Sequence, residues 1–319
     1  MSRPAAILGD VGGTRARFAR LELDGVVGPI LELATADFGD LAGAARAAFG
    51  RLGAADAAAI AIAAPVTGDR VELTNAGWQL SIDATRAALG VERLFVINDF
   101  EALARSLPAL AADDLDPVRA GSAATDAARV VVGPGTGLGV GALIRDGAGW
   151  RPLASECGHA DLAAGDEREW RVVERLAARH GGHVSNERAL SGPGLAELRD
   201  VVRELDGAAA EGLTPDRVAA LARAGEDAAA VEAARLFSSW LGALAGDLVL
   251  TFTARGGVWL GGGALAGLGG AFDRDRFAAR FVAKGRLRPF VEPVPVWRIR
   301  DSERATLRGA ASLLAEEAA

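Results

Sequence analysis

Three glycine-rich segments each follow a short apolar run, and each could bring the chain's backbone close to an anion. They are Gly9-Asp10-Val11-Gly12-Gly13-Thr14, Gly133-Pro134-Gly135-Thr136-Gly137-Leu138-Gly139 and Gly261-Gly262-Gly263. Turns rich in glycine can direct several N–H groups at one phosphate group. Because a carboxylate repels phosphate, Asp10 indicates a cation, Mg²⁺ held through water, although a tight hairpin turn explains the first segment equally well.

The second and third segments favour two different nucleotide-binding arrangements. Four glycines in the seven residues 133–139 are too many for an ordinary hairpin, which favours a second phosphate loop. Val258–Leu260 followed by Gly261–Ala266 matches the loose G-x-G-x-x-A form found in nicotinamide dehydrogenases. Little chain follows for a βαβ unit, and no acidic residue ends a second strand downstream. We therefore expect a loop that receives an adenosine.

Candidate residues for acid–base work and for binding hydroxyl groups lie elsewhere in the chain. Asn98-Asp99 follows the buried run Leu94–Ile97, where a general base could sit opposite a phosphate loop, although a helix cap is the alternative. Glu156, His159 and Glu187 suit a polyhydroxyl ligand, and a metal site is their alternative. Three histidines and one cysteine argue against structural zinc.

Composition excludes several classes of protein. The 319 residues suggest two domains, and the formal net charge of −7 disfavours binding to duplex nucleic acid. One cysteine, Cys157, fits the reducing cytoplasm. We expect neither a signal peptide nor a membrane span, since the apolar run from Leu236 to Ala254 is broken by Asp247. With Lys284 as the only lysine, a Walker loop is absent.

Apolar runs and helical spacings alternate along the chain, which predicts an α/β fold. Two segments echo each other, because Ala5–Leu21 and Arg129–Ile144 both predict a strand, a glycine-rich turn containing threonine, and a second strand. The echo suggests a duplicated architecture facing a common cleft. We predict a domain boundary in the polar segment 113–126, a long helix from Ala228 to about Leu250, and a last helix over Glu303–Glu317.

Taken together, the motifs resemble those of the bacterial glucokinase family, in the hexokinase–actin superfamily. Gly9–Thr14 and Gly133–Gly139 are similar to its two phosphate loops, and Gly257–Gly263 is similar to its adenosine loop. Its sugar-binding segments match these stretches: Asn75 to Trp78, Asn98-Asp99-Phe100, Glu156-x-x-His159, His183 to Arg188, and Leu190 to Gly194. The order and spacing of the motifs, over nearly the whole chain, carry the resemblance.

The resemblance implies a function and a role for each matched residue. The chain would transfer the γ-phosphoryl group of ATP to the 6-hydroxyl of D-glucose, the first step of glycolysis. Asp99 would be the general base, and Asp10 would orient hydrated Mg²⁺. The remaining implied sugar contacts are Asn75, Asn98, Glu156, His159 and Glu187. The implied nucleotide contacts are Gly9, Val11, Gly12, Gly13, Thr14, Gly135, Thr136, Gly137, Gly261, Gly262 and Gly263.

The resemblance also implies a two-domain hexokinase/actin-like (ribonuclease H-like) α/β fold with an inter-domain cleft. The small domain would span residues 1–110, completed by the C-terminal helix 301–319, and the large domain would span residues 111–300. A cytoplasmic homodimer without nucleic-acid or membrane partners is implied as well. One departure stands out, because Cys157 replaces the family's glycine and would cost about 1 kcal/mol if that position needed positive φ.

Alternatives remain at this stage. The substrate could be another hexose, such as mannose or glucosamine. A sugar-sensing repressor would need a DNA-binding helix-turn-helix before Gly9 and a cysteine cluster that this sequence lacks. An actin-like filament protein would bind nucleotide without needing the sugar residues, and a dehydrogenase would use a nicotinamide cofactor.

Overall fold

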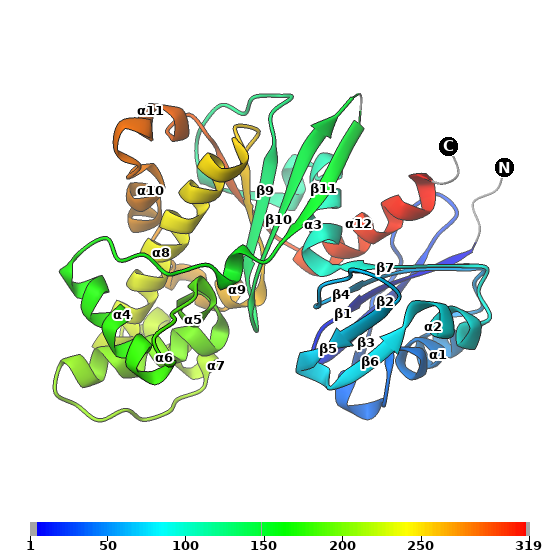
Figure 1. The fold of residues 1–319 in the computed structure, drawn as a ribbon, viewed down its shortest axis with the longest axis horizontal. Coiled ribbons are helices and arrows are strands. Elements are labelled where there is room, and N and C mark those ends of the chain that lie inside the picture. Colours follow the sequence, from blue (N-terminus) through cyan, green and yellow to red (C-terminus); the bar gives the residue numbers. More distant parts are fainter. Residues whose placement is uncertain (1–4, 148, 317–319) are drawn as a thin grey trace. The chain divides into compact units, whose positions relative to one another are not determined.

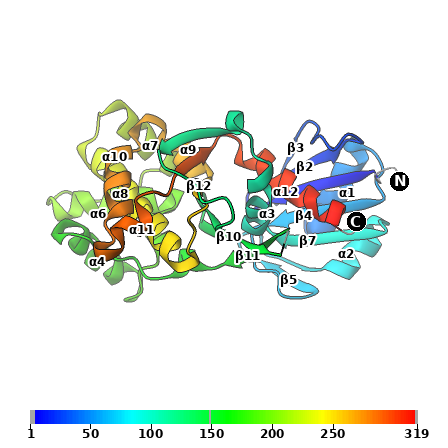
Figure 2. The same cartoon turned by 90° about the horizontal axis from the view of Figure 1, so that it is seen from above.

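The structure is a computed structural model that describes residues 5–147 and 149–316. The chain divides into two compact units, shown in Figures 1 and 2. The first unit comprises residues up to Asp114, Trp150–Ala154 and the segment from Asp301 onward. The second comprises Leu115–Gly149 and Ser155–Arg300.

The first unit is built on a five-stranded sheet with the order β3-β2-β1-β4-β7 and a small two-stranded sheet, β5-β6. Its strands are β1 (Ala6–Val11), β2 (Arg15–Leu21), β3 (Leu31–Ala34), β4 (Ala57–Ile62), β5 (Arg70–Leu73), β6 (Trp78–Ser81) and β7 (Arg93–Asn98). Its helices are α1 (Leu41–Leu52), α2 (Ile82–Leu89), α3 (Asp99–Ser106) and α12 (Ser302–Glu316).

Strand β1 separates two apolar clusters because its side chains alternate between the faces of the sheet. Ile7 packs with Ile60 and residues of α1 on one face. Leu8 packs with Leu307 and other residues of α12 on the opposite face. Helix α12 also lies along α3, as Figures 1 and 2 both show. The C-terminal helix is therefore part of this unit's core.

The second unit is built on a six-stranded sheet with the order β11-β10-β9-β12-β13-β8, although residues 150–154 of the edge strand β11 group with the first unit. Its strands are β8 (Leu115–Arg119), β9 (Arg129–Pro134), β10 (Leu138–Asp146), β11 (Gly149–Ser155), β12 (Val258–Leu260) and β13 (Val296–Ile299). Its helices are α4 (Glu167–Arg179), α5 (Asn186–Ala189), α6 (Gly192–Leu205), α7 (Pro215–Ala224), α8 (Ala228–Phe252), α9 (Gly263–Leu268), α10 (Arg274–Val282) and α11 (Arg288–Val291).

Helix α8 is the central helix of the second unit and contacts α6, α7 and α10 (Figure 1). It is the one helix among the described residues that is long and apolar enough to cross a membrane. In its most apolar window, however, 78% is buried inside the protein. Its composition therefore matches that of a core helix, whose neighbours supply the apolar surroundings.

The two sheets share one arrangement of four strands. In the first unit, β2 pairs antiparallel with β1, which pairs parallel with β4, which pairs parallel with β7. In the second, β10, β9, β12 and β13 repeat the same order and directions. The duplication that the two glycine-rich hairpins indicated is thus a property of the folded chain.

Several element predictions were wrong in detail. The first strand continues through Gly9 and Asp10 to Val11, so the turn itself is only Gly12–Thr14. Ser81 caps α2, and Gly90 ends that helix in the left-handed conformation. The polar segment 113–126 contains strand β8, and helix α7 was missed. The last helix begins at Ser302, one residue before the predicted start, and is described as far as Glu316, so the predicted end at Glu317 lies outside the described residues.

Candidate functional site

The first glycine-rich turn is held by neighbouring backbone. Thr35 donates from its Oγ1 to the carbonyl of Gly12 at 3.1 Å and from its N–H to the carbonyl of Thr14 at 3.0 Å. A Cβ atom on Gly13 would stand 2.6 Å from Cβ of Asn75. The predicted sugar residue Asn75 therefore lies against the predicted phosphate loop. Because Thr14 is exposed, its hydroxyl is available to a ligand.

The remaining residues of this motif, Gly9 to Val11, lie in strand β1 and form part of the sheet. A Cβ atom on Gly9 would meet Ile60 at 2.9 Å, so this glycine makes room for core side chains. Val11 is buried, and its carbonyl accepts from Ala63 N–H at 3.0 Å. Both residues lie within strand β1, and the turn that follows it begins at Gly12.

Asp10 is the carboxylate at the base of the turn, and its side chain is 16% exposed. Arg17 Nη1 lies 3.6 Å from its Oδ2, while the same guanidinium contacts Glu32 at 3.0 Å and Glu303 at 2.8 Å. Burial raises the pKa of Asp10 to about 6, against the opposing effect of Arg17. A cation near this carboxylate would relieve its poor solvation, so the residue suits an approaching hydrated Mg²⁺.

Asn98 and Asp99 stand where β7 becomes α3. Asn98 is the helix cap, because its Oδ1 accepts from the N–H groups of Phe100 at 2.9 Å and Glu101 at 3.1 Å. Its Nδ2 donates to the carbonyl of Ala64 at 3.3 Å. Asp99, half-buried in the first turn of α3, shares in this capping, because its Oδ1 accepts from Phe100 N–H at 3.0 Å. The capping alternative thus applies to both residues, with Asn98 as the helix cap.

The second glycine-rich turn spans Gly135–Gly137 between β9 and β10, and Gly133 and Pro134 belong to β9. Gly135 N–H donates to the carbonyl of Gly137, and its own carbonyl accepts from Gly192 N–H, both at 2.8 Å. Thr136 is exposed at the tip. A Cβ atom on Gly135 would meet nothing within 4 Å, so this residue leaves open space for a ligand.

Glu187 contacts the second turn directly. Its Oε2 accepts from Leu138 N–H at 2.8 Å, and a Cβ atom on Gly137 would stand 2.5 Å from the same oxygen. Gly158 lies against the backbone carbonyl of Leu138. A Cβ atom on Gly158 would stand 2.1 Å from that carbonyl oxygen. Residues predicted for sugar and residues predicted for phosphate therefore meet at Leu138.

The two predicted sugar segments of this unit pair with each other. Leu162 N–H donates to the carbonyl of Val184 at 2.8 Å, and Asn186 N–H donates to the carbonyl of Ala160 at 2.9 Å. Glu156 and His159 remain exposed, with Oε2 and Nε2 separated by 3.9 Å. Exposed side chains backed by a fixed backbone suit a ligand with many hydroxyl groups.

The third glycine-rich segment joins β12 to α9 beside the second turn. Gly261 N–H donates to the carbonyl of Val132 at 3.0 Å. Gly262 has φ of +87°, and a Cβ atom there would stand 2.2 Å from the carbonyl oxygen of Pro134. Only glycine fits both demands. Gly263 is exposed and has open space around its Cα, so it is the member of this segment that a nucleotide could approach.

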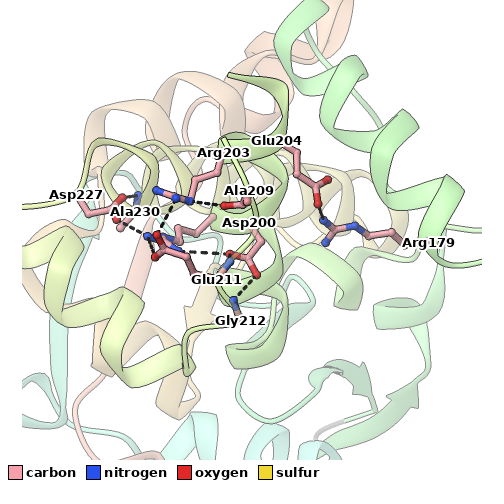
Figure 3. A network of polar contacts seen from close by, with 10 residues as sticks. Arg179, Asp200, Arg203, Glu204, Ala209, Glu211, Gly212, Asp227 and Ala230 are labelled. Atoms are coloured by element: carbon pink, nitrogen blue, oxygen red, sulfur yellow. Dashed lines mark hydrogen bonds and ion pairs between the residues drawn. The ribbon is translucent and has the colours of Figure 1, made fainter. Parts of the chain in front are cut away.

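An ionic network supports α6, whose first residue holds the second turn (Figure 3). Arg199, with its side chain 2% exposed, donates to Glu211 at 2.7 Å and to Asp227 at 2.6 Å. Asp200 accepts from the N–H groups of Glu211 and Gly212, and Asp227 caps α8 (Figure 3). The network fixes the segment 207–214 and the start of α8 to α6.

Cys157 does not strain the sugar loop. Its φ is negative, since Thr253 is the one described non-glycine residue with positive φ. The crowded position is Gly158, and Cys157 packs half-buried against the core of the second unit. Burial raises the pKa of its thiol, with a further contribution from Asp247. Cys157 therefore does not carry the backbone strain that a side chain would have at a position with positive φ.

Comparisons with known proteins decide the family. A family model described as glucokinase matches residues 7–317. A glucokinase from Chromobacterium violaceum is 44% identical over 315 residues, which cover 98% of this chain and 90% of that protein. This chain belongs to the glucokinase family. A glucokinase from Aromatoleum aromaticum is also 44% identical, over 97% of this chain and 94% of its own.

Solved glucokinase structures share the fold. That of a glucokinase from an Antarctic psychrotroph has a TM-score of 0.85 at 33% identity, covering 99% of this chain and 100% of its own. A glucokinase of the ROK family from Streptomyces griseus, in complex with glucose and AMPPNP, has a TM-score of 0.70 at 22% identity and covers 98% and 99%. The predicted two-domain α/β fold of the hexokinase–actin type is confirmed.

Sequence reasoning missed several residues that shape the site in this member of the glucokinase family. Arg17, Glu303 and Thr35 brace the first turn, and the backbone of Leu138 joins Glu187 to the second. Backbone donors leave no signal in residue types. Arg17 follows the first motif by three residues and alternates with apolar neighbours, so it looked like an ordinary exposed strand residue.

Proposed function

We propose that this chain is an ATP-dependent glucokinase that converts D-glucose to glucose 6-phosphate. The observation that carries the proposal is its membership of the glucokinase family over residues 7–317, with 44% identity to a named glucokinase. The ordered phosphate, adenosine and sugar motifs support the same activity. Phosphoryl transfer needs little covalent work from a protein, so positioning and charge neutralisation supply most of the rate enhancement.

Asp99 is the proposed general base. It accepts the proton of the sugar 6-hydroxyl as that oxygen bonds to the γ-phosphorus, and the bond from phosphorus to the ADP oxygen breaks. Support comes from its half-buried position directly after β7, where Asn98 is the helix cap and Asp99 Oδ1 also accepts from Phe100 N–H at 3.0 Å. Asn98 thereby orients Asp99, and its Nδ2 keeps one hydrogen for a sugar oxygen.

Glu156, His159, Glu187 and Asn75 are proposed to bind the other sugar hydroxyls. Carboxylates accept hydroxyl hydrogen bonds more strongly than neutral groups do. The exposed Glu156 and His159 offer such groups on a loop fixed by backbone pairing. The two units are proposed to correspond to the small and large domains expected from the sequence.

The two turns and the Gly261–Gly263 segment are proposed to receive ATP. Gly12, Gly13 and Thr14 would contact phosphate oxygens from the first turn, and Gly135, Thr136 and Gly137 would do so from the second. Asp10 would hold the Mg²⁺ that ATP carries, through water. The proposed homodimer rests on the family resemblance, and the proposed cytoplasmic location also rests on the presence of a single cysteine.

The experiment is a coupled assay of purified protein with ATP, Mg²⁺ and a panel of hexoses that includes mannose, fructose and glucosamine. Glucose 6-phosphate should accumulate, and chelation of Mg²⁺ should stop the reaction. Preference for another hexose would replace glucose in the proposal. Absence of phosphorylated product with every sugar would overturn it.

A further inference from the structure

We propose that Glu187 is a positioning residue that couples sugar binding to the shape of the second glycine-rich turn. The inference rests on the proposed function, in which Glu187 also accepts a sugar hydroxyl. Its carboxylate fixes the N–H group of Leu138, so occupation of the sugar site changes the turn's affinity for the phosphate groups of ATP.

The contact is short and well anchored. Glu187 Oε2 accepts from Leu138 N–H at 2.8 Å, and this amide begins β10 directly after the turn. The backbone of Glu187 is itself held, because Ser191 Oγ donates to its carbonyl at 2.9 Å. Asn186, the preceding residue, is buried and donates from Nδ2 to Ala160 at 3.0 Å. The carboxylate therefore lies at a fixed distance from the turn.

The shape of the turn depends on that carboxylate. Gly137 leaves no room for a side chain on this face, since a Cβ atom would stand 2.5 Å from Glu187 Oε2. The carbonyl of Leu138 is equally close to the other sugar segment, where a Cβ atom on Gly158 would stand 2.1 Å from it. Movement of either sugar segment thus displaces the residue that ends the turn.

Two physical effects set the direction of the coupling. A carboxylate has about four acceptor positions, so a sugar hydroxyl can bind Glu187 while Leu138 stays bound. A second hydrogen-bond donor restricts the motion of the carboxylate and of the turn that is bonded to it. Less conformational entropy is then lost when the turn binds phosphate. The hydroxyl also offsets part of a negative charge that repels phosphate. Both effects make the sugar tighten nucleotide binding.

The experiment measures the dissociation constant of a non-hydrolysable ATP analogue with Mg²⁺, without glucose and with saturating glucose. Wild type should bind the analogue at least about 5-fold more tightly with glucose, at the lower end of typical couplings. In Glu187→Ala that ratio should fall to about 1, and Glu187→Gln, whose amide oxygen can still accept from Leu138, should keep part of it. Glu174→Gln is the control, because Glu174 is exposed on α4 and lies outside the proposed sugar and nucleotide residues, and it should keep the wild-type ratio.

Amide exchange of Leu138 in the sugar-free protein tests the contact independently of activity. Exchange should accelerate about 10-fold or more in Glu187→Ala, as expected when roughly 1.4 kcal/mol of protection is lost, and little in Glu187→Gln. The Gly261 amide, bonded to Val132, should be unchanged and so excludes general unfolding. Unchanged Leu138 exchange, or an equal ratio in wild type and Glu187→Ala, overturns the inference. Failure of glucose phosphorylation in wild type overturns the proposed function instead.

Discussion

The two glycine-rich hairpins have the same strand order and directions, yet they are supported by different means. The turn between β1 and β2 carries its own carboxylate, Asp10, which is poorly solvated and faces Arg17. The turn between β9 and β10 has no carboxylate of its own, and Glu187 of α5 binds its backbone instead. The same strand arrangement thus has a carboxylate beside the first turn, and at the second turn a carboxylate that is bonded to the backbone.

Under the proposed function, the two turns would contribute to nucleotide binding in different ways. A carboxylate at the first turn suits a hydrated cation, whereas a carboxylate bonded to an amide at the second turn suits control by another ligand. Substitutions at Asp99, at Asp10 and in the two turns test this difference, with the largest effect expected at Asp99, the proposed base.

Asp99→Asn should lower kcat by about 10²–10⁴-fold, because an amide cannot accept the proton of the sugar hydroxyl. Steady-state kinetics with glucose and MgATP measure the effect. Glu101→Gln is the matched control on the same helix, since Glu101 is paired with Arg105. A kcat of Asp99→Asn within a few-fold of wild type would show that the general base is another residue. The proposal that the first unit supplies the base would then be wrong.

Asp10→Asn should raise stability at neutral pH. Because burial raises the folded pKa of Asp10 to about 6, above its unfolded value, the protonated group supports folding below about pH 4, and that support is lost as the pH rises through 6. The loss amounts to about 3 kcal/mol by pH 8, and the asparagine variant avoids it.

Urea denaturation without nucleotide, at pH 5 and pH 8, measures this difference. The advantage of Asp10→Asn over wild type should grow between those values. A difference between Asp10→Asn and wild type that is the same at both pH values would show that Asp10 is well solvated or strongly paired.

Gly13→Ala should destabilise the first unit by about 1–3 kcal/mol, because its Cβ atom would stand 2.6 Å from Asn75 Cβ and 3.0 Å from a backbone oxygen. Gly12→Ala is the matched control, with its nearest contact at 3.7 Å. Thermal or urea unfolding compares the two variants. Equal losses of stability would mean that Asn75 moves freely and does not brace the turn.

Gly137→Ala should cost less stability than Gly13→Ala, since the obstructing atom is the end of the flexible Glu187 side chain. Its effect should fall on nucleotide binding, with about a 5–10-fold loss of affinity if roughly 1 kcal/mol of the Glu187–Leu138 bond is lost. Gly135→Ala is the control, because its Cβ atom would meet no protein atom within 4 Å. It measures the effect of crowding the ligand without displacing Glu187. Unchanged affinity in Gly137→Ala would show that the turn tolerates movement of Glu187.

Cys157→Gly should leave activity nearly unchanged, because Cys157 has negative φ and no strain is relieved. The raised pKa of its thiol predicts slow alkylation near neutral pH. Alkylation followed by peptide mass spectrometry, with and without glucose, measures access to the thiol. Labelling at equal rates in both states would show that the thiol does not report on the sugar loop.

Much of the fold could be predicted because glycine-rich turns and buried apolar runs are local signals. The hairpins at Gly12–Thr14 and Gly135–Gly137 and the long helix α8 are of this kind. Strand β8 was missed because its sequence, Leu-Asp-Pro-Val-Arg, has the composition of a polar loop. It is a strand only because β13 offers it a partner, with Arg298 bonded to Asp116 at 2.6 Å.

The sequence proposes residues for the candidate site but not the contacts that hold them. Sequence motifs identified Asp10, Asp99 and Glu187, since resemblance carries residue types and their order. The partners of these residues come from distant positions, such as Glu303 beside Arg17, or from backbone groups, such as the amide of Leu138. Such contacts follow from tertiary structure, which the spacing of residues along the chain does not specify.

The central claim, that this chain phosphorylates glucose with Asp99 as base, has one most direct test. Purified wild type and Asp99→Asn are each mixed with MgATP and glucose in excess, and glucose 6-phosphate is quantified over time. The account predicts steady accumulation with wild type and at least about a 100-fold slower rate with Asp99→Asn, while both bind the ATP analogue. No glucose 6-phosphate from wild type, or equal rates from both proteins, would contradict it.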